Sequence, residues 1–172
     1  MKKSFLFAFG LAVFLLVSCA STPKFTYDVD IQYESDNPAV SLEVNPTYSS
    51  NLIYGSGFGG FICTFKNNTD KTARVVWDES SLNYGGSSYV PFIEGQKYID
   101  AQNPMSPAAI TKGGMITKGV YSSNQPHYTS GQYGGWSMIP IRSTTVQLLF
   151  MIKSDKGEEY ITATVNAIPI TE

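Results

Sequence analysis

Residues 144–168 read TTVQLLFMIKSDKGEEYITATVNAI, and this stretch decides the fold class. Apolar residues recur at every second position on both sides of Ser154-Asp155-Lys156-Gly157, as expected for two half-buried strands. The Asp-Lys-Gly centre is typical of a hairpin loop that ends on a left-handed glycine. Leu149 and Met151 make the second face of the first strand partly apolar, which indicates a central position in a sheet.

Shorter runs of the same alternation occur along the rest of the chain. The clearest covers residues 25–33, where aromatic or aliphatic residues occupy every second position. Further strands are expected at residues 40–44, 61–66, 72–78 and 87–93, and in pieces of 109–121. Turn-forming residues 67–70 separate two of these runs, so residues 61–78 are expected to form a hairpin. The glycine-rich residues 47–60 and residues 94–108 are expected to be loops.

These runs predict an all-β domain over residues 25–172, a single immunoglobulin-like β-sandwich of about seven to nine strands. Trp77 is the candidate for the large core residue between the sheets. Cys63 lies within an apolar run and is expected to be a buried small hydrophobe, because unpaired cysteine is among the most buried residue types. Residues 65–78 resemble the hairpin of small uncharacterised immunoglobulin-like bacterial lipoproteins, a resemblance that implies no function.

The composition argues against nucleic-acid binding. Charged residues make up only 15% of the chain, well below the usual quarter. Without Lys2 and Lys3, 10 basic residues remain against 14 acidic ones, a net charge of −4. The sequence has no cluster of Lys and Arg residues that could bind a phosphate backbone, so we expect no nucleic-acid partner.

The N-terminus carries an export signal. Lys2 and Lys3 precede an apolar stretch, residues 5–17, which has the length of a signal-peptide core and is too short to span a bilayer comfortably. We therefore expect residues 1–18 to be a cleaved signal peptide and residues 19–24 to be a short linker.

Leu16-Val17-Ser18-Cys19 resembles the lipobox of bacterial lipoproteins. The resemblance covers only this region, and it implies a diacylglyceryl group on the Cys19 thiol, cleavage before Cys19 and acylation of the new amine. Two or more acyl chains suffice for stable membrane anchoring. Residue 20 is Ala rather than Asp, which favours the outer membrane under the sorting rule of enteric bacteria.

Motifs that would indicate a cofactor, a metal or catalysis lack their structural context. Residues 55–60 match the G-x-G-x-x-G spacing, but a strand-like run follows where a dinucleotide site needs a helix. His127 is the only histidine, so a multi-histidine zinc site is not available. Asp28 and Asp30 share one strand face, as on a solvated edge strand. We expect no cofactor, no nucleotide, no metal and no enzymatic activity.

Residues 121–136 form the candidate binding segment. Its Tyr, Ser, Gly, Asn and Trp residues are typical of adaptable recognition loops. The candidate binding residues are Tyr121, His127, Tyr128, Tyr133 and Trp136. Tyr48, Tyr54 and Phe58 could extend the same patch. The alternative is that these rings pack back over the edges of the core.

Together these features predict a lipid-anchored protein of the bacterial cell envelope that binds a protein or a glycan through Tyr- and Gly-rich loops. One alternative is a periplasm-facing structural or assembly component of the envelope. A hydrolase that uses His127 is the weakest alternative.

Overall fold

The computed structural model describes residues 26–34, 38–51, 53–132 and 134–170. Val29–Ile168 form one compact unit, and the described residues outside it are 26–28 at the start of the first strand and 169–170 at the end of the last. The expected signal peptide, Cys19 and the linker lie outside the described residues. Within the described ranges, no helix has the length and apolar character that a membrane span requires.

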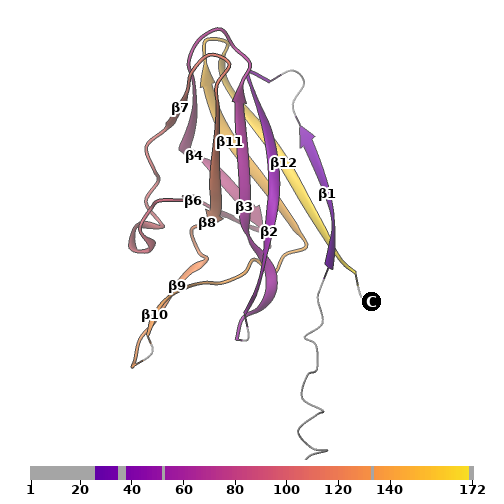
Figure 1. The fold of residues 1–172 in the computed structure, drawn as a ribbon, viewed down its shortest axis with the longest axis vertical. Coiled ribbons are helices and arrows are strands. Elements are labelled where there is room, and N and C mark those ends of the chain that lie inside the picture. The colour runs from indigo at the N-terminus through magenta and orange to yellow at the C-terminus, as the bar shows by residue number, and fades with distance from the viewer. Residues whose placement is uncertain (1–25, 35–37, 52, 133, 171–172) are drawn as a thin grey trace, which may run out of the picture. The chain divides into compact units, whose positions relative to one another are not determined.

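Two antiparallel sheets and a separate two-stranded ribbon make up the fold (Figure 1). The larger sheet contains, in spatial order, β1 (Thr26–Glu34), β12 (Gly157–Ile170), β11 (Thr145–Ser154), β4 (Ala73–Tyr84) and β5 (Ser87–Tyr89), with β7 (Ala108–Ile110) also paired to β4. The second sheet contains β2 (Val40–Asn51), β3 (Gly55–Asn67), β8 (Met115–Ser122) and β6 (Pro91–Ile93). The ribbon, which we call the β9–β10 ribbon, consists of β9 (Pro126–Thr129) and β10 (Gly135–Met138). A 3-10 turn, η2 (Tyr98–Asp100), follows β6.

The expected all-β sandwich is confirmed. The described residues form twelve strands rather than seven to nine, because five of them have only three or four residues and are too short to show an alternation.

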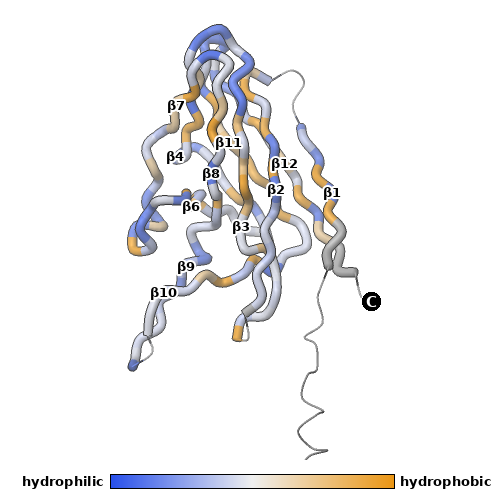
Figure 2. Tube along the Cα trace, in the orientation of Figure 1, coloured by the Kyte–Doolittle hydropathy of each residue, from blue (hydrophilic) through white to orange (hydrophobic). Residues whose placement is uncertain are grey.

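Aromatic rings from both sheets meet in the core. Phe65 of β3 packs edge-to-face on Trp77 of β4 and on Phe150 of β11, with ring centroids 5.7 and 5.0 Å apart. All three are buried, which confirms Trp77 as the large core residue. Cys63 is also fully buried, as expected, and burial raises the pKa of its thiol. Figure 2 shows hydrophobic residues along β11 and hydrophilic turns at the end of the sheets opposite the β9–β10 ribbon.

The hairpin predicted from residues 144–168 is confirmed. β11 and β12 pair from Thr145↔Asn166 to Ser154↔Gly157, and Gly157 has a φ of 116° in the turn. β11 lies between β12 and β4, so its predicted central position is confirmed as well. Its register on β4 shifts between Leu149 and Met151, and the Ser80 hydroxyl bridges the irregularity. That hydroxyl donates to the Val76 carbonyl and accepts from the Met151 N–H.

The hairpin predicted for residues 61–78 is wrong, because β3 and β4 belong to different sheets. The buried side chain of Asn67 holds the connection between them. Its Nδ2 donates to the carbonyls of Lys71, Ile110 and Thr111, and its Oδ1 accepts from the N–H and hydroxyl of Thr69. The turn residues therefore direct the chain across the sandwich instead of back along the same sheet.

The loop predicted for residues 47–60 is also wrong. β2 and β3 pair along their whole length, from Val40↔Asn67 to Asn51↔Gly55, as one long hairpin. The glycines lie within β3, and the register shifts between Thr47 and Tyr48, opposite Gly59. Glycine marks this strand because neighbouring groups approach its backbone closely, as described below.

Candidate functional site

The β9–β10 ribbon places two aromatic rings on one of its faces. Trp136 lies directly opposite Tyr128, and Met138 lies opposite Pro126 two residues further along the same face. The Tyr128 and Trp136 ring centroids are 5.5 Å apart. Figure 1 shows the ribbon extending beyond the ends of the two sheets. It therefore presents this aromatic pair outside the core.

Two tyrosines from the sandwich continue the row of rings. The Tyr98 ring, in η2, lies 5.8 Å from Trp136, and Phe92 of β6 lies 5.7 Å from Tyr98 and 5.9 Å from Tyr121 of β8. Phe92 is buried, whereas Tyr98, Trp136 and Tyr128 are exposed by 41%, 43% and 57%. We call Tyr98, Tyr121, Tyr128 and Trp136 the aromatic surface, and Phe92 is its buried support.

A hollow of about 220 Å³ opens beside the aromatic surface. It is lined by Phe92, Glu94, Gly95, Gln96, Tyr98, Tyr121 and Met138. Its volume lies below the range of about 300–1,000 Å³ usual for whole small-molecule ligands. It is therefore suited to one residue of a larger ligand whose remainder lies across the exposed rings.

Glu94 and Tyr121 provide the polar groups of the hollow. Glu94 Oε2 accepts a hydrogen bond from the Gly119 N–H at 3.2 Å. Among the described residues, the second carboxylate oxygen of Glu94 and the Tyr121 hydroxyl have no hydrogen-bond partner. Burial, with a further contribution from the Glu94 carboxylate, raises the pKa of Tyr121, so its hydroxyl remains protonated and can donate.

Two glycines make room for Tyr121. A Cβ atom on Gly60 would lie 2.5 Å from the Tyr121 ring, far inside van der Waals contact. A Cβ on Gly119 would lie 3.0 Å from the Tyr121 hydroxyl and 3.2 Å from Glu94 Oε2, so both polar groups converge over that glycine. The glycine-rich run of β3 therefore leaves room for the Tyr121 ring, a role unlike the phosphate binding that its spacing imitates.

Gln125 attaches the β9–β10 ribbon to the sandwich. Its side chain is buried, accepts from the Ser122 N–H and donates to the carbonyl of Gly59 in β3 and to that of Ile139, which follows β10. A second attachment joins Phe58 and Ile141 through two backbone hydrogen bonds of 2.9 Å each. Gly57 permits this approach, since a Cβ there would lie 2.3 Å from the Ile141 carbonyl oxygen.

Three of the five candidate residues from the sequence lie together in the aromatic surface. They are Tyr121, Tyr128 and Trp136, which belong to strands rather than to the expected loop. His127 lies on the opposite face of the ribbon, where its ring contacts Tyr54 at 5.7 Å. Tyr133 lies outside the described residues.

Tyr48, Tyr54 and Phe58, which could have extended the patch, all lie outside the aromatic surface. Tyr54 lies near the ribbon as expected, but it meets His127 instead of the aromatic surface. Phe58 is buried in the core, with the Tyr48 ring stacked on it at 5.3 Å. The alternative that aromatic rings pack over the core edge is therefore correct for Tyr48 and Phe58.

The sequence did not single out Tyr98, Glu94, Met138 or Gln125. The first two lie in segments with no clear period, and their roles depend on contacts with distant parts of the chain. Met138 and Trp136, two residues apart, share a strand face, and this alternation was a usable signal.

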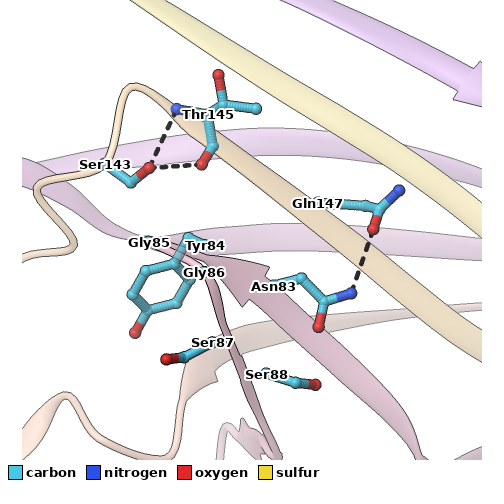
Figure 3. Close-up of a pocket in the computed structure, with 9 residues that line it drawn as sticks. All are labelled: Asn83, Tyr84, Gly85, Gly86, Ser87, Ser88, Ser143, Thr145 and Gln147. Atoms are coloured by element: carbon cyan, nitrogen blue, oxygen red, sulfur yellow. Dashed lines mark hydrogen bonds between the residues drawn. The ribbon is translucent and has the colours of Figure 1, made fainter.

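A second, wider hollow lies at the β4–β5 turn (Figure 3). Its volume is about 510 Å³, and its lining is mainly glycine, serine, threonine and amide side chains. Asn83 Nδ2 donates to Gln147 Oε1, while Asn83 Oδ1 is buried without a partner among the described residues. Tyr84, the one aromatic residue in the lining, has its hydroxyl within hydrogen-bond distance of Ser122 Oγ and Asn124 Oδ1, and Asn124 Oδ1 can only accept. The hollow beside the aromatic surface has three aromatic residues in its lining, whereas this one has a single aromatic residue, so the aromatic surface is the stronger candidate.

No cluster of three or more His, Cys, Asp or Glu side chains suited to a metal occurs within the described ranges. Neither protein-family models nor curated proteins match this chain. The functional argument therefore depends on the site itself.

Proposed function

We propose that this protein is a lipid-anchored component of the bacterial cell envelope, and that it binds a protein or a glycan through its aromatic surface without catalysing a reaction. The resemblance of residues 16–19 to a lipobox supports the anchor. The exposed row of Tyr98, Trp136 and Tyr128, beside the hollow that contains Glu94, carries the binding proposal.

The chemistry of these rings suits recognition. Tyrosine and tryptophan offer large contact areas at a low cost in conformational entropy, and they are enriched among the residues that dominate binding energy. Solvent-exposed apolar rings gathered into one patch are less common than scattered ones and are typical of interaction sites.

The binding proposal can be tested in intact cells that produce the full chain. A photoreactive benzoylphenylalanine in place of Tyr128 should form an adduct of higher mass on irradiation, and Trp136→Ala together with Tyr98→Ala should abolish it. The control places the same photoreactive residue at Tyr160, which is similarly exposed on β12. Equal adducts at both positions, or none at Tyr128, would contradict the proposal.

The anchor and its location need separate measurements. Cys19→Ala should move the protein from the membrane fraction to the soluble fraction and abolish labelling by radioactive palmitate. Protease added to intact cells should cleave a surface-displayed domain while sparing a known periplasmic protein. Protection until the outer membrane is opened would instead favour a periplasm-facing role in envelope assembly.

A further inference from the structure

The segment that carries the ribbon has no strongly charged side chain. Residues 119–141, 23 in all, include no Asp, Glu, Lys or Arg, and they supply Tyr121, Tyr128 and Trp136. Glu94 is the only charged residue that lines the hollow. A phosphate-bearing or acidic ligand would find no cation there and one repelling carboxylate. An acidic ligand is therefore disfavoured at this surface.

The spacing of the exposed rings suits a linear ligand built of repeated ring-shaped units. Successive ring centroids from Tyr128 to Trp136 to Tyr98 are 5.5 and 5.8 Å apart, comparable with the length of one sugar residue in a linear glycan. Adjacent ring planes are tilted by 56° and 41°, so a ligand that follows them must twist along its length. Linear glycans twist at their glycosidic bonds, and the C–H face of each sugar ring packs well on an aromatic face.

The polar groups of the hollow match hydroxyl chemistry. The protonated Tyr121 hydroxyl can donate, and the Glu94 oxygen that has no partner among the described residues can accept from a ligand O–H. A hydrogen bond from a hydroxyl to a carboxylate is shorter and stronger than one between neutral groups. Met138 and Phe92 supply an apolar wall for the carbon skeleton between these two polar groups.

We propose that the aromatic surface binds a neutral carbohydrate, with one sugar residue in the hollow beside Glu94 and Tyr121 and the following residues across Trp136 and Tyr128. This inference rests on the proposed binding function and names its ligand class. A protein ligand fits less well, because a standard interface buries about 800 Å² per partner and gains specificity from complementary charges. The charge-free ribbon offers a protein no such complementarity.

The test uses the full chain, purified from membranes in a zwitterionic detergent because detergents with sugar headgroups would compete for the site. Isothermal titration measures binding of neutral hexasaccharides of glucose, xylose and N-acetylglucosamine, with an oligogalacturonate as the acidic control. At least one neutral oligosaccharide should bind, and the acidic one should not. Trp136→Ala should weaken binding at least about tenfold, Trp136→Phe should weaken it less, and Tyr160→Ala should leave it unchanged.

The possible failures are distinguishable. Absence of binding to every neutral oligosaccharide, together with a protein adduct from the photoreactive residue at Tyr128, would overturn the carbohydrate inference and leave the binding function standing. Absence of both would overturn both proposals. Binding that Trp136→Ala does not affect would place the carbohydrate elsewhere and overturn the inference.

Discussion

Replacing Asn67 with alanine should destabilise the fold far more than replacing the asparagine beside it. Asn67 makes five hydrogen bonds from a buried side chain, three as donor and two as acceptor. After truncation, the Thr69 hydroxyl no longer has Asn67 Oδ1 as an acceptor and can donate its proton to the Lys71 carbonyl, and the Thr111 carbonyl still accepts from the Gly114 N–H. The Thr69 N–H loses its acceptor, and the Ile110 carbonyl loses this donor. At about 1–3 kcal/mol for each of these two buried groups, the expected loss is about 2–6 kcal/mol.

Urea unfolding followed by tryptophan fluorescence measures this loss, because Trp77 moves from the core to water. Asn68→Ala is the matched control: Asn68 is exposed, and its side chain donates one hydrogen bond of 3.3 Å, to the Pro38 carbonyl. It should cost no more than about 1 kcal/mol. A loss below about 1 kcal/mol for Asn67→Ala, or equal losses for both variants, would show that the Asn67 side chain does not hold the crossing between the sheets.

Three further changes test other parts of the structure. Gly60→Ala should displace the Tyr121 ring, lowering the unfolding free energy by about 1–3 kcal/mol and weakening the proposed binding at the aromatic surface. If neither the unfolding free energy nor the binding changes, Gly60 is not needed to make room for Tyr121. Ser80→Ala should cost about 1–3 kcal/mol in urea unfolding, because the buried Met151 N–H loses its acceptor, whereas Ser143→Ala on the exposed surface should cost little. Burial raises the pKa of the Cys63 thiol, so the unfolded chain releases that proton first and stability should fall as pH rises above about 8.5. Comparing urea midpoints at neutral and alkaline pH should show a smaller fall for Cys63→Ala, and an equal fall would remove Cys63 as a cause.

Alternation along the chain was sufficient to predict the sandwich and its terminal hairpin. These features depend on neighbouring residues and on which face of a strand each side chain occupies. The connection after Asn67 could not be predicted in this way. Two of the hydrogen-bond partners of Asn67, Ile110 and Thr111, lie 43 and 44 residues further along the chain, so no local pattern indicates these contacts. Turn residues alone are equally compatible with a hairpin.

The candidate site could be predicted only in part, for a related reason. Composition identified Tyr121, Tyr128 and Trp136, but it could not separate them from His127. That separation requires the pairing of the β9–β10 ribbon, which alternates its side chains between two faces. Tyr98 joins the site only because η2 brings it to Trp136 from 38 residues away, and no local pattern indicates that contact.

The aromatic surface is divided between two pieces of backbone, since Tyr128 and Trp136 belong to the β9–β10 ribbon while Tyr98 and Tyr121 belong to the sandwich. Neither half-site alone offers the full row of rings. A ligand that spans both halves must therefore hold the ribbon against the sandwich, and each half gains affinity from the presence of the other. Under the proposed binding function, ligand occupancy and ribbon docking are therefore linked equilibria, and hydrogen exchange at Ile139 and Ile141 should slow when the ligand is added.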